Sequence, residues 1–257
     1  MRFFASEFVN NYATYSFGYC EYAQWEPGDD LEPIYARGYL PYSGDPGEPR
    51  HLFYKCRSLR VNTAEFGFDK KRRYHQRRLD ELGPVFSLHE KDAYLAAHQV
   101  QLEVDALQWI DQRFDQAYLT PERLRYILAK PYLNRIAEVR LEGKVVAYAL
   151  LVAWSQGVHY WYSFYDSAVV TELSLGKWLM GRTLEWAQEQ AVPYVYLGTA
   201  YRQKSAYKSQ GTRGAYFFDG ADWLADKDRL KQLQLRDERL ALPEADLFKR
   251  GIDPQEL

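Results

Sequence analysis

Hydrophobic and polar positions follow two different patterns along the chain, with a change near residue 85. Before that point, short segments such as residues 51–61 alternate apolar and polar side chains, and clusters of Pro, Gly and Asp separate them. Alternation with period two is typical of strands, and such clusters are typical of turns. After the change, apolar residues recur at helical spacing, for example at Leu102 and Trp109. We therefore predict a small, loop-rich β domain over residues 1–84.

The remainder of the chain predicts helices and strands in a definite order. Thr120 followed by Pro121 is typical of a helix start, because Thr caps free N–H groups and Pro fits the first turn. Gly143 indicates a hairpin turn between two apolar runs. The predicted elements are helices over 90–114 and 120–130, strands over 135–142, 145–154 and 157–166, a helix over 173–190, and strands over 194–198 and 215–220.

This order of elements is that of the GNAT acetyltransferase fold, in which the third strand and the strand after the central helix separate to make a V-shaped cleft. We therefore predict an α+β, GNAT-like mixed sheet flanked by helices over residues 85–235, followed by a charged, helix-prone tail over 236–257. A fold of this kind supports many chemistries, so the function has to be argued from individual residues.

Composition limits the partners and the compartment. The chain has 257 residues and a formal net charge of −2, so no overall basic field attracts nucleic acid, and any polyanion site has to be a local patch. The N-terminus lacks a signal-peptide pattern, and no stretch approaches the roughly 20 apolar residues of a membrane span. We expect a soluble, monomeric, cytoplasmic protein without membrane contact.

The two cysteines, Cys20 and Cys56, are too few for a secreted disulfide scaffold. Together with His51 and His75 they are the candidates for metal ligands. Structural zinc and iron–sulfur sites need about four ligands, however, and the sequence has no CxxC spacing. We predict two reduced thiols, no bound metal and no cofactor.

The loop before the central helix is the first candidate site. A helix N-terminus presents unpaired N–H groups that attract phosphate, here at Ser174, Gly176 and Lys177. A pyrophosphate cradle needs several glycines so that the backbone comes close to the ligand, and this loop has one. The loop therefore favours a single phosphate over coenzyme A, and a plain helix cap explains Ser174 equally well.

Basic residues gather in two other places. In the first, Tyr74 and His75 are suited to stacking on a nucleic-acid base while the cations neutralise phosphates. Its cations are Lys70, Lys71, Arg72, Arg73, Arg77 and Arg78, with Lys55, Arg57 and Arg60 upstream. In the second, Lys204 and Lys208 lie beside Tyr207 and share a face if the segment is an α-helix. Solvated surfaces account for either cluster without any ligand.

A carboxylate ends the aromatic third strand. Asp166 would lie at the mouth of the cleft, where it can accept a proton from an attacking amine. Glu172 is the second candidate for this role. Asp also commonly caps turns, which is the alternative interpretation of Asp166.

Several segments, in the correct order, resemble the aminoacyl-tRNA–protein transferases, specifically the arginyltransferase family and its bacterial leucyl-transferring relatives. In the N-terminal part they are GYCEYAQ, ARGYLP and YKCRSLRVNTAEFGFDKKRR, at residues 18–24, 36–41 and 54–73. In the C-terminal part they are SFYDSAVVTELSLGKWLM and EWAQEQAVPYVYLGTAYRQKSAYK, at residues 163–180 and 185–208. The sequence departs from the family pattern at Ser167, where Pro is usual, at Asp69, where Ser is usual, and in its reduced set of cysteines.

The resemblance implies that the acyl donor is an aminoacyl-tRNA, which makes a glycine-rich loop unnecessary. It implies transfer of arginine or leucine to the N-terminal amine of an acceptor protein or peptide that begins with Asp or Glu. Asp166 would accept the proton or orient the amine, with Tyr165 and Ser174 lining the cleft. Residues that would bind tRNA are Lys70, Lys71, Arg72, Arg73, Gly176, Lys177, Lys204, Tyr207 and Lys208. Of these, Lys204 and Lys208 would hold either the terminal adenosine or the acidic first residue of the acceptor. The other candidates for binding that acidic residue are Arg37, Arg57 and Arg60.

Two other functions stay open on the residues alone. An acyl-CoA-dependent N-acetyltransferase would be stabilised by CoA and unaffected by tRNA. A non-catalytic RNA-binding protein on the same scaffold would bind tRNA with a strong salt dependence and would form no product.

Overall fold

The computed structural model describes residues 1–13, 15–112, 119–169, 174–239 and 251–252. The chain forms two compact units, each built from segments that are distant in sequence. The first unit contains Met1–Ser58, Thr199–Ala206 and Phe217–Leu257, and the second contains Leu59–Gly198 and Tyr207–Tyr216.

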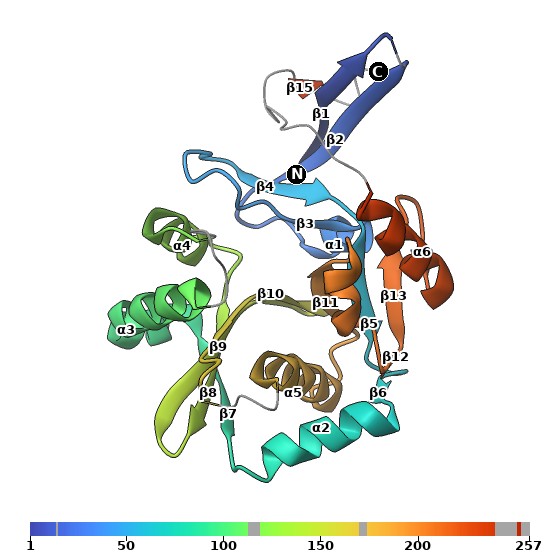
Figure 1. The fold of residues 1–257 in the computed structure, drawn as a ribbon. Coiled ribbons are helices and arrows are strands. Elements are labelled where there is room, and N and C mark those ends of the chain that lie inside the picture. The colour runs from blue at the N-terminus through green and yellow to red at the C-terminus, as the bar shows by residue number, and fades with distance from the viewer. Residues whose placement is uncertain (14, 113–118, 170–173, 240–250, 253–257) are drawn as a thin grey trace. The chain divides into compact units, whose positions relative to one another are not determined.

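The first unit is built on an antiparallel sheet with the strand order β15-β1-β2-β4-β3 (Figure 1). These strands are β1 (Arg2–Asn11), β2 (Ser16–Trp25), β3 (Tyr39–Pro41), β4 (His51–Lys55) and β15 (Gly251–Ile252). The unit also contains α1 (Glu32–Ala36), β14 (Trp223–Leu224) and α6 (Lys227–Asp237).

Aromatic side chains fill the core of the first unit. Tyr22 and Phe53 are fully buried, and the rings of Phe4 and Tyr22 stack with their centroids 5.3 Å apart. Gly38 follows α1 with a φ of +80°, and a Cβ there would come within 2.2 Å of the Phe218 ring. The left-handed backbone and the close approach of the ring both require glycine at this position.

The second unit is built on a mixed sheet with the order β5-β11-β10-β9-β8-β7. The strands are β5 (Ser58–Asn62), β7 (Val85–Glu90), β8 (Arg135–Leu141), β9 (Lys144–Trp154), β10 (Gly157–Tyr165) and β11 (Tyr194–Thr199). The helices are α2 (Lys70–Asp80), α3 (Lys91–Asp111), α4 (Pro121–Leu128) and α5 (Leu175–Glu189). Two short strands, β6 (Gly67–Phe68) and β12 (Thr212–Arg213), pair with each other. The chain passes from one unit to the other within two further elements, the 3-10 helix η1 (Gln203–Lys208) and β13 (Ala215–Phe218).

Helices α3 and α4 cover one face of this sheet, and Figure 1 shows α5 on the other side. The predicted apolar stripe of α3, which includes Leu102 and Trp109, packs with Leu150 and Phe164 of the sheet in one buried cluster. The side chain of Thr120 accepts a hydrogen bond from the Arg123 N–H, so the predicted cap of α4 is confirmed.

Strands β10 and β11 separate partway along their length. Their parallel register joins Gly157–His159 to Tyr194–Tyr196. β10 then continues to Tyr165 beside β9, and its register with β9 shifts between Tyr160 and Tyr162. A bulge of this kind bends a strand and increases its twist. The element order and this separation confirm the predicted α+β, GNAT-like fold.

Some elements differ from those predicted. Residues 85–90 form a strand that was not among the predicted elements. Most of its side chains are half-buried, so apolar and polar residues do not alternate clearly along it. The predicted α-helical face shared by Lys204 and Lys208 is wrong, because η1 is a 3-10 helix, in which residues three apart align. Lys204 is therefore aligned with Tyr207 instead. Of the predicted tail over 236–257, residues 240–250 and 253–257 lie outside the described part of the chain.

Candidate active site

The start of α5 lies directly against the end of β10. Ser174 caps α5 by accepting a hydrogen bond from the Lys177 N–H at 3.4 Å. A Cβ at Gly176 would come within 2.3 Å of the Tyr165 ring, so glycine is needed for this ring to lie on the first turn. The structure thus brings together three predicted site residues, and it gives Gly176 a packing reason in addition to the predicted phosphate contact.

Three segments of the second unit meet around a pocket of about 280 Å³ at the start of α5. They are α2 with its N-cap Asp69, the N-terminal turn of α5 and residues 207–211. Five predicted site residues line this pocket: Lys71, Arg72, Ser174, Lys177 and Tyr207. Residues from three separate predicted clusters therefore converge on one basic pocket at a helix N-terminus, where phosphate binding is favoured.

Arg72 builds the wall of this pocket. Its guanidinium Nη1 donates hydrogen bonds to the backbone carbonyls of Tyr207 at 2.8 Å and Gln210 at 3.1 Å. The guanidinium also lies over the Phe68 ring, 4.8 Å from its centroid. Burial lowers the pKa of Arg72, and the nearby Asp69 charge offsets part of this effect. Arg72 consequently holds residues 207–210 in place as well as adding positive charge.

Helix α2 is fixed on α5 by side-chain hydrogen bonds. The buried Gln76 amide donates to the Trp178 carbonyl at 3.0 Å, and the Trp178 indole donates to Asp80 at 2.8 Å. A Cβ at Gly181 would come within 2.5 Å of the Gln76 amide, which allows the two helices to approach closely. The sequence offered no sign of this contact, because Gln76 and Trp178 are about a hundred positions apart.

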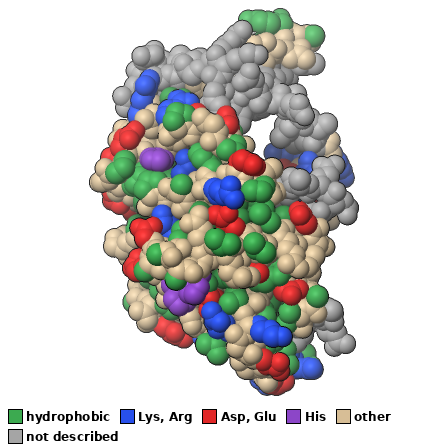
Figure 2. Space-filling view, turned by 90° about the vertical axis from the view of Figure 1, so that its left-hand side faces the viewer, with side chains coloured by type: hydrophobic (Ala, Val, Ile, Leu, Met, Phe, Trp, Pro, Cys, Tyr) green, Lys and Arg blue, Asp and Glu red, His purple; other side chains and the backbone are tan. Residues whose placement is uncertain are grey.

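The opposite side of α2 faces an open groove of about 460 Å³. Lys70, Arg73 and Arg77 line this groove beside Tyr74, which is 47% exposed. The predicted basic run is therefore divided by the helical period between a pocket and a groove. On the face drawn in Figure 2, acidic and basic side chains are interspersed, in keeping with the small net charge.

A lysine and a histidine lie near the point where β10 and β11 separate. Burial, together with a smaller effect of the positive charge of Lys208, lowers the pKa of His159 to about 3. Gly198 has a φ of +82°, and a Cβ there would lie 3.3 Å from Lys208 Nζ. Since the charge of Lys208 acts on His159, the Lys208 ammonium lies near both His159 and the end of β11. His159 was not predicted as a site residue, since a single His within an aromatic strand carries no spacing signal.

The two predicted carboxylates have different outcomes. Asp166 lies one residue beyond β10, and its Oδ1 accepts a hydrogen bond from the Ala168 N–H at 2.9 Å. Its own N–H donates to the Val146 carbonyl at 3.0 Å. Asp166 thus caps a turn, the alternative left open by the sequence, while remaining next to Tyr165. Glu172 lies outside the described residues.

The remaining predicted site cations are elsewhere. In the first unit, the Arg37 guanidinium lies over the Phe3 ring at 5.1 Å, Arg57 pairs with Asp237 at 2.6 Å, and Lys204 is exposed. In the second unit, Arg60 lies over the Tyr194 ring at 4.2 Å. A shared binding site for the three arginines stays a prediction.

The cysteines are free thiols, Cys56 buried and Cys20 half-buried, and burial raises the pKa of Cys20. Within the described ranges, no three His, Cys, Asp or Glu residues are grouped as metal ligands. Among the helices that the structure describes, none combines the length and apolar character needed to cross a membrane.

Comparison with known proteins gives matches to transferases. Residues 98–213 match the family model described as "Arginine-tRNA-protein transferase, C terminus". An aspartate/glutamate leucyltransferase of Chromohalobacter salexigens is 35% identical over 99 residues, which are 37% of this chain and 39% of that relative. The match therefore spans about two fifths of the relative's length.

Solved structures with a related backbone were also found. The crystal structure of FemX has a TM-score of 0.46 at 10% identity, covering 79% of this chain and 70% of that one. L-PGS from Bacillus licheniformis has a TM-score of 0.44 at 15% identity, covering 73% and 62%. Residues 98–213 are thus similar to the C-terminal part of arginine-tRNA-protein transferases, in agreement with the family resemblance of the motifs.

Proposed function

We propose that the protein is an aminoacyl-tRNA–protein transferase that moves an amino acid from a charged tRNA to the N-terminal amine of an acceptor protein or peptide. We propose leucine as the transferred residue and Asp or Glu as the acceptor's first residue, because the curated relative is named an aspartate/glutamate leucyltransferase. Arginine, for which the family model is named, is the other donor to be tested.

The observation that supports this proposal best is the composition of the pocket at the start of α5. Lys71 and Lys177 supply positive charge for phosphates, and Tyr207 supplies a ring suited to a nucleotide base. The first turn of α5 has a single glycine, and the space beside that glycine is taken by the Tyr165 ring. Such a turn suits the end of an RNA better than a coenzyme diphosphate that needs several close backbone contacts.

The proposed reaction exchanges an ester for an amide. The acceptor amine attacks the ester carbonyl carbon, a C–N bond forms, and the C–O bond to the terminal ribose breaks. The amine loses a proton, and the departing ribose oxygen gains one. Because the ordinary pKa of an α-amine is about 8, a modest base such as Asp166 suffices, and positioning supplies much of the rate.

Lys208 is proposed to meet the acidic side chain of the acceptor or the terminal nucleotide, since its ammonium lies where β10 and β11 separate. Lys70, Arg73 and Arg77, along the groove side of α2, are proposed to contact tRNA phosphates.

The test is a transfer assay with radiolabelled leucyl- and arginyl-tRNA and with peptides that begin with Asp, Glu, Arg or Lys. We expect label to appear on Asp- and Glu-peptides with leucyl-tRNA as donor. Label on no peptide, combined with a rise in melting temperature on addition of CoA, would favour an acyl-CoA N-acetyltransferase. Tight tRNA binding without labelled product would favour a non-catalytic RNA-binding protein.

A further inference from the structure

The groove on the outer side of α2 carries charges of both signs. Its cations Lys70, Arg73 and Arg77 follow one another along one face of the helix. At roughly 1.5 Å of rise per residue, this row spans about 10 Å of the helix axis. Within the described part of the chain, neither Lys70 nor Arg73 has an acidic partner, and the acidic partner of Arg77 is Glu81 at 3.9 Å. The row is therefore open to a ligand with several negative charges.

Two carboxylates line the same groove, Asp80 from α2 and Glu185 from α5. The Trp178 indole donates a hydrogen bond to Oδ1 of Asp80 at 2.8 Å, and the Arg182 guanidinium donates one to Oε2 of the other carboxylate at 2.5 Å. The second oxygen of each carboxylate accepts no hydrogen bond from any described residue. Burial raises the pKa of Glu185, and the negative charge of Asp80 acts in the same direction. Both carboxylates are thus held in place, and each keeps one oxygen for a ligand's N–H group.

A third acceptor comes from a buried side chain between the two helices. Gln76 is 6% exposed and lines the groove, and its Nε2 donates to the Trp178 carbonyl at 3.0 Å. This contact identifies the other amide atom as the oxygen, to which no group in the described ranges donates. Because buried polar side chains are normally hydrogen-bonded, an acceptor left open at a groove points to a ligand with a matching donor.

An aromatic ring lies beside the cations. Tyr74 is 47% exposed and lines the groove, and its hydroxyl accepts a hydrogen bond from Arg78 at 3.2 Å. The Arg77 guanidinium lies 5.9 Å from the centroid of this ring. An exposed ring next to cations suits a nucleic acid, because every base has a face that can stack on it.

We propose that this groove is a subsite for an unpaired nucleotide of the tRNA and that it selects a base with an exocyclic amino group. The phosphates lie on the row of cations, the base lies along the Tyr74 ring, and the amino group donates to the open oxygens of Asp80 and Glu185. Adenine, cytosine and guanine carry such a group, whereas uracil has carbonyl oxygens, which carboxylates repel. This inference rests on the proposed function, and it adds base selection to the phosphate contacts proposed for this side of α2.

An acceptor peptide that begins with an acidic residue is the other ligand with charges of both signs. Its amine would meet the carboxylates, and its acidic side chain would meet a cation. One acidic side chain needs a single cation, however, whereas the groove presents a row of three beside an exposed ring. The row and the ring therefore favour the nucleotide.

The experiment compares the affinities of the full chain for short single-stranded oligo(C) and oligo(U), because cytosine and uracil differ at the amino group. The test variant combines Asp80→Asn with Glu185→Gln, which keeps an oxygen for the indole and for the guanidinium. The matched control combines Glu142→Gln with Glu189→Gln, two exposed changes that remove the same charge elsewhere. Fluorescence anisotropy at fixed salt gives each dissociation constant, and thermal unfolding checks the folding of each variant.

We expect the unchanged chain to bind oligo(C) at least tenfold more tightly than oligo(U). In the test variant this ratio should fall to within twofold of one, because an amide presents a donor as well as an acceptor. The control should keep the ratio. Lys71→Gln combined with Lys177→Gln should also keep it, because these lysines line the other pocket.

Equal affinity of the unchanged chain for the two oligonucleotides, or a ratio that the test variant leaves unaltered, would overturn base selection. Binding of an Asp-initiated peptide that the test variant abolishes, without a base preference, would assign the groove to the acceptor. Either result combined with amino-acid transfer from charged tRNA would leave the proposed function intact. If the unchanged chain binds no RNA and transfers no amino acid, the proposed function itself fails, and the nucleotide subsite fails with it.

Discussion

Arg72 and Arg73 are neighbours in one basic run, yet the two sides of α2 give them opposite environments. Arg72 is 9% exposed, stacks on Phe68 and donates to two backbone carbonyls. Arg73 is exposed and lines the open groove. The pocket side of α2 is thus bound to the protein, and the groove side is open to solvent or to a ligand.

This contrast shows that positive charge alone does not define a binding residue. A buried, hydrogen-bonded arginine stabilises a segment, and its removal leaves polar partners without donors. An exposed arginine contributes little to folding and is suited to meet a phosphate. The helical period decides which member of the run has which environment, because residues 72, 76 and 79 share the buried side.

The largest difference in stability between variants on the pocket side and on the groove side of α2 is expected for Arg72→Ala. It removes two hydrogen bonds from a charged donor and should lower the free energy of unfolding by about 3 kcal/mol, with loss of transfer activity. Arg73→Ala should change the free energy of unfolding by less than about 0.5 kcal/mol. Urea unfolding of both variants measures the difference, and equal stabilities would contradict the contrast.

A smaller effect, confined to the ligand, is expected at the pocket lysines. Lys71→Gln combined with Lys177→Gln should weaken the binding of uncharged tRNA about tenfold or more without changing stability, because two phosphate contacts are lost. Lys144→Gln, an exposed change in the β8–β9 hairpin, is the control. The measurement is a fluorescence titration at fixed salt. Unchanged affinity in the double variant would remove the pocket from the binding site.

The smallest effect is expected on the groove side. Arg73→Gln and Arg77→Gln should each lower the slope of log K for tRNA against log salt concentration by about 1, with a modest loss of affinity at low salt. Titrations at several salt concentrations give the slope. A slope identical to that of the unchanged chain would show that the groove side does not contact phosphates.

Local signals predicted much of the fold. Residue type and position predict Thr120 as a helix cap and Ser174 as either a cap or a phosphate contact, and both residues accept the hydrogen bond of a cap. The turn at Gly143 follows from the same kind of local signal, since Leu141 pairs with Lys144 around it. These features depend on a few neighbouring residues, which a sequence displays directly.

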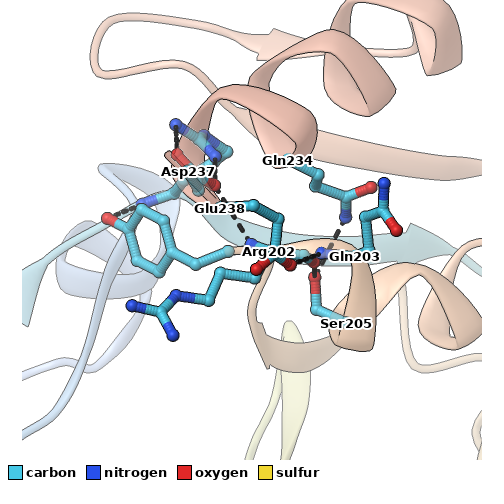
Figure 3. Close-up of polar contacts among 8 residues, drawn as sticks. Arg202, Gln203, Ser205, Gln234, Asp237 and Glu238 are labelled. Atoms are coloured by element: carbon cyan, nitrogen blue, oxygen red, sulfur yellow. Dashed lines mark hydrogen bonds and ion pairs between the residues drawn. The ribbon is translucent and has the colours of Figure 1, made fainter. Parts of the chain in front are cut away.

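Features that depend on distant residues were not predictable. The sequence contained the basic run, the α5 loop and Tyr207, but nothing in it indicated that they line one pocket. The contact between Gln76 and Trp178 joins two helices, and the hydrogen bond from the Arg202 N–H to Asp237 joins segments 35 positions apart (Figure 3). A 3-10 helix in place of an α-helix at η1 likewise follows from these tertiary contacts rather than from local preference.

The most direct test of the account compares the affinity of the unchanged chain for an uncharged tRNA with its affinity for the same tRNA lacking its single-stranded 3′ end. If the pocket at the start of α5 holds an RNA end, removal of that end should weaken binding at least tenfold, and the double variant at Lys71 and Lys177 should bind both RNAs equally. Equal affinity of the unchanged chain for both RNAs, with CoA bound at the same pocket, would contradict the account.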